Sequence, residues 1–179
     1  MSFFRIREAR QDDVAGMAKV RVDTWKATYQ GIVPDEFLQG LSYQRVAENW
    51  KRIFWENKEP NVTRFVAETM QDDIVGIAIC GPERDQDSIY HGEIYVLYVL
   101  PQYQNRGIGQ ELVAKCVQYL IQQLKVETML IWVFAENPYR RFYESLGGIM
   151  VREKTIEIGG KMISEVGYGW KKIQPLVII

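Results

Sequence analysis

Hydrophobic and polar positions change their period several times along this chain, and each change predicts a new element. Alternation at residues 4–7 predicts a first strand. Apolar positions from Val14 to Trp25 recur at helical spacing behind an aspartate that can cap a helix. After a break at residues 31–35, a second helical stretch from about Pro34 to Trp55 is expected in two pieces around Gly40.

The middle of the chain predicts three consecutive strands. Residues 64–68 and 74–80 flank a polar turn and predict a hairpin. Residues 94–100 are apolar at every position, so we expect this third strand at the centre of a sheet and buried on both faces. Pro101 ends it, because proline lacks an N–H for the sheet ladder.

The last part of the chain predicts a long helix and four shorter elements. Apolar residues within 109–124 fall on one face of a helix. The shorter elements are a strand, a helix stopped by two glycines, and a closing hairpin. They are expected at residues 128–134, 137–146, 149–158 and 162–170.

The predicted order β-α-α-β-β-β-α-β-α-β-β indicates an α/β fold of the α+β kind. We expect a mixed, mostly antiparallel central sheet with helices on both faces. The strand–helix–strand unit from Ile94 to Phe134 should form a right-handed parallel crossover. The chain shows no repeat and no low-complexity linker, so residues 1–179 are expected to form a single domain.

Composition narrows the class of protein. The chain is 47% hydrophobic and 25% charged, as in ordinary globular proteins. A formal net charge of −1 argues against a nucleic-acid partner. No signal peptide or membrane-spanning run is present, so we expect a cytoplasmic protein without membrane contact. Cys80 and Cys116 lack the spacing of a metal site, and we expect two free thiols and no metal.

Residues 104–109, Gln-Asn-Arg-Gly-Ile-Gly, form a turn between an apolar strand and an amphipathic helix. A helix N-terminus presents unpaired backbone N–H groups and partial positive charge, which suit phosphate. Gly107 and Gly109 carry no Cβ, so a pyrophosphate can approach the backbone. The Rossmann pattern fails at Leu112, and no Walker motif is present. The turn therefore predicts a phosphorylated ligand without naming it.

Two motifs together resemble the GNAT superfamily of acyl-CoA-dependent N-acyltransferases. Residues 95–109 look like its fourth strand and pyrophosphate loop, and residues 135–147 look like its second signature. The likeness covers roughly Ile74 to Trp170. It implies the GNAT fold and an enzyme that transfers an acetyl group from acetyl-CoA to a primary amine, by direct attack in a ternary complex. The second signature departs from the family, because its Asn-to-Tyr spacing is one residue shorter than usual.

The resemblance also implies a set of cofactor-binding residues. Backbone amides of the loop would hold the pyrophosphate of coenzyme A, and the main chain of the fourth strand would pair with its pantetheine arm. Free N–H groups there could also hold the thioester oxygen as negative charge develops. The implied residues are Leu97, Tyr98, Val99, Gln104, Asn105, Arg106, Gly107, Ile108, Gly109, Gln110 and Asn137.

Tyr143 matches the family's tyrosine near the departing sulfur. Since a tyrosine has a pKa of about 10 and a thiol one of about 8.5, full proton transfer to the thiolate is uphill. We therefore interpret Tyr143 as a hydrogen-bond donor to the developing thiolate. The alternative is a core aromatic residue.

An amine with a pKa of about 10.4 is almost entirely protonated at neutral pH, so the reaction calls for a base. Glu93 opens the fourth strand, at a place similar to the base of the histone-acetylating branch. Apolar surroundings would raise its pKa toward a useful value. His91, the only histidine, is a second candidate, and a plain exposed carboxylate is the alternative for Glu93.

Trp25 and Tyr29 lie four residues apart on the first helix and face the same way. With Thr28 and the loop at residues 31–34, they lie where the family often forms its acceptor pocket. Ordinary helix packing explains the pair equally well. Asp23, Asp35 and Glu36 could pair with a cationic acceptor, but nothing distinguishes one of them.

The resemblance implies a small-molecule or peptide amine as the acceptor. The alternative functions are a non-catalytic CoA-binding sensor or adaptor and a nucleotide-binding module. A homodimer could form through the last hairpin or the apolar tail at residues 176–179.

Overall fold

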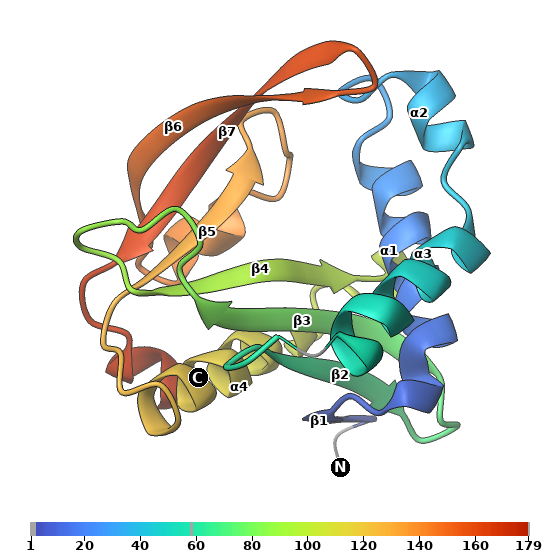
Figure 1. The fold of residues 1–179 in the computed structure, drawn as a ribbon. Helices are drawn as coiled ribbons and strands as arrows, with labels where there is room; N and C mark the ends of the chain where they lie inside the picture. Colours follow the sequence, from blue (N-terminus) through green and yellow to red (C-terminus); the bar gives the residue numbers. More distant parts are fainter. Residues whose placement is uncertain (1–2, 58, 179) are drawn as a thin grey trace.

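The computed structural model describes residues 3–57 and 59–178 and contains a seven-stranded sheet (Figure 1). The strand order is β1-β2-β3-β4-β5-β7-β6. Neighbouring strands are antiparallel except β4 and β5, which are parallel and joined through α4. The strands are β1 Phe4–Glu8, β2 Thr63–Thr69, β3 Ile74–Pro82, β4 Gly92–Val99, β5 Met129–Phe134, β6 Ile149–Ile158 and β7 Lys161–Trp170. The predicted mixed, mostly antiparallel sheet is confirmed.

Helices cover both faces of the sheet, as predicted. Helix α4 packs on one face, while α1 and α3 pack on the other (Figure 1). Gly76 of β3 permits the close approach of α4, because a Cβ there would lie 3.1 Å from Ile108 and 3.2 Å from Leu112. The helices are α1 Val14–Thr28, α2 Asp35–Gln39, α3 Tyr43–Lys51, α4 Ile108–Gln122 and α5 Arg141–Ser145.

Strand β4 is central, as predicted, but it is not buried on both faces along its whole length. Residues Tyr95 to Tyr98 are only half-buried. The physical reason is that β4 pairs with β5 only at Gly92, Glu93 and Ile94, after which the two strands diverge. Residues 95–98 of the apolar run therefore border an opening between β4 and β5.

The short helix expected at residues 137–146 begins only at Arg141. Asn137 Oδ1 accepts a hydrogen bond from the Tyr139 backbone N–H at 2.8 Å, which holds the chain in a turn. The predicted glycine stop is confirmed: Gly147 has a φ of 80°. Next to it, a Cβ on Gly148 would lie 2.5 Å from the Trp170 ring, so α5 packs closely against β7.

The loop between β3 and β4 is held to β6 by ion pairs. Asp87 binds Arg152 at 2.9 Å and Asp85 binds Lys154 at 3.0 Å. The β3–β4 loop therefore extends past β5 and β7 to reach β6, the edge strand of the sheet.

The apolar tail expected as a dimer surface is in part core. Ile173 is fully buried and Leu176 is 5% exposed, and their segment packs against α4. Ile179 lies outside the described residues. The last hairpin does expose Ile149, Met150 and Met162, so dimerisation there stays a prediction.

Among the described residues, every helix is too short or too polar to span a membrane.

A partly buried ion network joins the start of the chain to β2. Arg7 contacts Glu68 at 2.7 Å and Asp13 at 2.7 Å, and Arg5 contacts Glu68 at 2.6 Å. The hydrogen bond from Arg7 is the main cause that lowers the pKa of Glu68 from 4.5 to about 2. Glu68 is 5% exposed, so its charge is stabilised by these partners.

Lowering the pH should reduce the stability of the fold, because Glu68 is stabilised in its charged form by Arg7 and Arg5. The unfolded chain takes up the proton near pH 4.5 and the folded chain only near pH 2, so the free energy of unfolding should fall as pH decreases through this window. Urea unfolding at a series of pH values would show it. Glu68→Gln should flatten that part of the curve, while the exposed control Glu153→Gln should not.

Candidate active site

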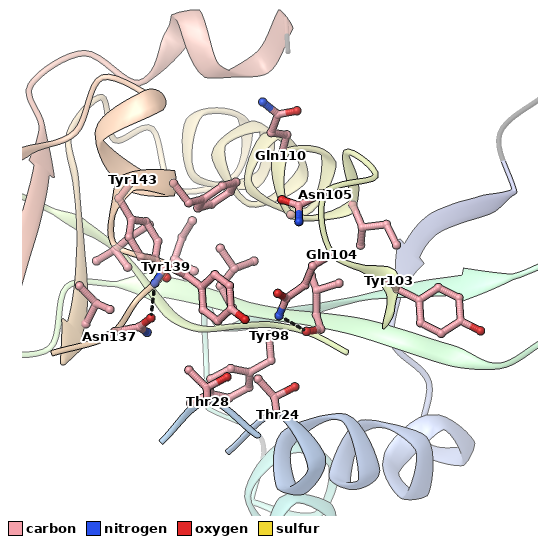
Figure 2. Close-up of a pocket in the computed structure, with 18 of the residues that line it drawn as sticks. Thr24, Thr28, Tyr98, Tyr103, Gln104, Asn105, Gln110, Asn137, Tyr139 and Tyr143 are labelled. Carbon is pink, nitrogen blue, oxygen red and sulfur yellow. Dashed lines mark hydrogen bonds between the residues drawn. The ribbon is translucent and has the colours of Figure 1, made fainter. Parts of the chain in front are cut away.

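The divergence of β4 from β5 opens a cleft of about 430 Å³ (Figure 2). Its walls come from α1, the open edges of β4 and β5, the turn before α4, and the segment leading into α5. Backbone groups of β4 beyond Ile94 have no partner in β5. Such groups need hydrogen-bond partners, so this edge can pair with an extended ligand.

The turn before α4 is fixed at the mouth of this opening. Gln104 Nε2 donates a hydrogen bond to the Val99 carbonyl at 3.0 Å, which ties the turn to the end of β4 (Figure 2). Asn105 and Gly107 adopt left-handed backbone conformations with φ of 58° and 85°. Both residues line the cleft.

Helix α4 presents its N-terminus to the cleft. It starts at Ile108, and the Glu111 N–H is bonded to the Gly107 carbonyl at 3.0 Å. Amide N–H groups of the preceding residues have no acceptor inside a helix. Gly107, Ile108, Gly109 and Gln110 all line the cleft, so these donors and the positive end of the helix dipole lie at its wall.

Ten of the eleven residues predicted to bind the cofactor line this cleft. Arg106 does not: its guanidinium lies 5.3 Å from the Phe3 ring and 5.7 Å from the Tyr103 ring, at the surface. The ten are Leu97, Tyr98, Val99, Gln104, Asn105, Gly107, Ile108, Gly109, Gln110 and Asn137.

Tyr143 reaches the cleft from α5, as Figure 2 shows, and its residue is 8% exposed. Its ring stacks on Tyr168 at 5.7 Å. Among the described residues its hydroxyl has no hydrogen-bond partner. Burial raises the pKa of Tyr143 above its usual value, and the neighbouring Tyr98 raises it further. The hydroxyl is therefore kept protonated and free to donate.

The structure separates the two aromatic residues predicted for the acceptor. Tyr29 lines the cleft, but Trp25 does not. Trp25 instead donates from Nε1 to the Tyr98 hydroxyl at 2.9 Å, and its ring packs against Tyr29 at 5.1 Å. Trp25 therefore helps to orient Tyr98, a cleft residue, without lining the cleft itself.

Glu93 does not line the cleft. It is 1% exposed, and its carboxylate accepts hydrogen bonds from the backbone N–H, Nε and Nη2 of Arg84. Glu93 is therefore held in an ion pair with Arg84, away from the cleft. His91 does not line the cleft either, and its side chain is exposed.

The acidic candidates of the first helices also lie elsewhere. Asp23 binds Lys19 at 2.6 Å and accepts a hydrogen bond from the Tyr43 hydroxyl at 2.6 Å. Asp35 and Glu36 are exposed at the start of α2. The structure brings none of the three to the cleft.

Thr28, expected near the acceptor pocket, lines the cleft, and so do Thr24 and Trp132, which the sequence analysis did not single out. The buried Thr24 hydroxyl has no partner within the described chain, and neither has the Trp132 indole N–H. The two threonines repeat at the same four-residue spacing as Trp25 and Tyr29, one position earlier. This spacing could have indicated that Thr24 faces the same opening as Thr28. Hydroxyl-bearing residues on a helix more often face solvent, so the spacing alone did not distinguish Thr24.

Comparisons with known proteins agree with this arrangement. Residues 25–148 match the model of the acetyltransferase (GNAT) family. An uncharacterised N-acetyltransferase, YuaI of Bacillus subtilis, is 34% identical over 171 residues, which is 96% of this chain and 95% of that protein.

Solved structures show the same fold. The PaiA N-acetyltransferase of Thermoplasma acidophilum, in complex with coenzyme A, superposes with a TM-score of 0.66 at 19% identity, over 92% of this chain and 98% of that one. YncA of Salmonella typhimurium, a putative acetyltransferase with its cofactor acetyl-CoA, gives 0.67 at 17% identity, over 94% of each chain. The chain belongs to the GNAT family of acetyltransferases.

Proposed function

We propose that this enzyme transfers the acetyl group of acetyl-CoA to a primary amine within a ternary complex. One observation supports this most directly: the unpaired edge of β4 opens beside the N-terminus of α4. The unpaired edge of β4 can pair with an extended amide-bearing chain, and the N-terminus of α4 can bind phosphate. Coenzyme A carries both groups, a pantetheine arm and a pyrophosphate.

The left-handed turn suits a pyrophosphate. A Cβ on Gly107 would meet no atom within 4 Å, so the space above this backbone is open toward a ligand. Backbone N–H groups from Gln104 to Gln110 would hold the phosphate oxygens. Because Arg106 lies against two aromatic rings at the surface, the amides and the helix dipole supply most of the binding.

Tyr143 would assist the leaving sulfur. When the amine nitrogen attacks the thioester carbon, the carbon–sulfur bond breaks and a thiolate leaves. The protonated Tyr143 hydroxyl can donate a hydrogen bond to that sulfur, and its raised pKa disfavours full proton transfer. Direct attack is favoured over an acyl-enzyme, since Cys80 and Cys116 are buried in the core away from the cleft.

The function is tested by thiol release. Wild-type protein with acetyl-CoA and a panel of primary amines, including alkylamines, diamines and a lysine peptide, should release free thiol in an amine-dependent manner. Detection with a thiol reagent and mass measurement of the product would identify the acetylated amine. Tight coenzyme A binding by calorimetry, with no release for any amine, would instead support the CoA-binding sensor.

Tyr143→Phe should lower kcat by at least about tenfold, because a donor to developing negative charge is lost. The dissociation constant for coenzyme A should change little. Tyr168→Phe is the matched control: its ring stacks on Tyr143, but its hydroxyl bonds Glu144 and lies outside the cleft. Loss of coenzyme A affinity in Tyr143→Phe would show a structural role.

Gly107→Ala should weaken coenzyme A binding, measured by calorimetry. Its φ of 85° is costly for alanine by about 1 kcal/mol or more, so the turn would relax and move its amides. Gly160→Ala is the control, because Gly160 has a φ of 79° and equally open space in the β6–β7 turn. Both variants should lose similar stability, and only the first should lose affinity.

A further inference from the structure

Glu165 of β7 lies outside the lining of the cleft, on the face of the sheet that α1 covers. In the sheet register it lies opposite Phe134 of β5 and Lys154 of β6, and directly opposed side chains project from the same face. The Phe134 ring lies 4.6 Å from Tyr29, a cleft residue from α1. Glu165 therefore stands on the α1 side of the sheet, one strand beyond the β5 wall that Trp132 forms.

Charges around Glu165 do not balance. Arg84 is paired with Glu93, and Lys154 is paired with Asp85 at 3.0 Å. Lys154 also sits 3.9 Å above the Trp132 ring. Glu165 itself has no hydrogen bond and no ion pair within the described chain. Of these five charged groups, Glu165 is the one without a partner, so the cluster carries one surplus negative charge.

This surplus charge is half-buried, which makes it costly in the free protein. Burial raises the pKa of Glu165, while Lys154 and Arg84 act in the opposite direction and Glu93 and Asp85 add to the rise. The charge of Glu165 also contributes to the raised pKa of Tyr29 and Tyr98, two residues that line the cleft. Glu165 is thus close enough to act on the cleft electrostatically.

The surroundings suit a bound cation. Tyr29, Phe134 and Trp132 provide aromatic surfaces on the same side, and aromatic faces attract organic ammonium groups. The reacting centre, in contrast, lies at β4 and α5, where Tyr98 and Tyr143 meet the cleft. Glu165 stands on a different strand from either, displaced from that centre along the sheet.

We propose that Glu165 binds a second cationic group of the acceptor, away from the amine that is acetylated. The acceptors would then be diamines, polyamines or peptides with two neighbouring positive charges. This inference rests on the proposed acetyl transfer and specifies its substrate class. Glu165 acts here on specificity, and it leaves the chemistry of the attacking amine unchanged.

The test compares 1,4-diaminobutane with n-butylamine, which lacks the second charge. In wild-type protein the diamine should have the lower KM. Glu165→Gln should raise the KM of the diamine by about tenfold or more, the effect of losing a charge-assisted hydrogen bond. It should leave kcat, the KM of acetyl-CoA and the KM of n-butylamine nearly unchanged. Glu165→Asp should lie between the two.

Glu157→Gln is the matched control, because it removes an exposed carboxylate from the same hairpin and should behave as wild type. An unchanged diamine KM in Glu165→Gln would overturn the inference, as would an equal loss for n-butylamine. Loss of diamine selectivity in Glu93→Gln alone would overturn it too.

Calorimetry of 1,4-diaminobutane with the CoA-loaded protein separates the two proposals. Weaker binding in Glu165→Gln than in wild type supports the inference even if no amine is acetylated, a result that would refute the proposed function alone. Equal binding in both proteins would overturn the inference while leaving acetyl transfer to other amines intact.

Discussion

The early end of the β4–β5 ladder is the constraint on which the rest of this structure depends. Parallel pairing stops after Ile94, so the part of β4 from Tyr95 to Val99 has no partner strand on its β5 edge. Burial would make unpaired backbone groups there costly, and the sheet instead leaves this edge at a cleft. Tyr98 and Tyr143 face this opening because β4 and the α5 segment border it (Figure 2).

Polar contacts on the α1 side of the sheet fix the β3–β4 loop and the start of β4. The β3–β4 loop lies across to β6 through Asp87–Arg152 and Asp85–Lys154, and Arg84 covers Glu93. A carboxylate that looked free in the sequence is thereby neutralised. Glu165, which belongs to no motif, is left without an ion-pair partner among the described residues.

Local patterns predicted most of the fold because its elements are strongly periodic. The apolar face of α4, the hairpins and the glycine-rich turn depend on residues close together in the sequence. The start of α5 could not be read in this way. A single side-chain bond from Asn137 to the Tyr139 amide competes with helix geometry and delays the helix to Arg141.

The sequence by itself determined the family, the sheet and the position of the glycine-rich turn before α4, since each follows from short-range pattern and spacing. Only the tertiary structure decided which charges are free. Glu93 is neutralised by Arg84, nine residues away, whereas Glu165 remains unpaired although Lys154 lies opposite it in the sheet. Ion pairing depends on distances of a few ångströms between separate strands and loops, and sequence spacing does not encode those distances.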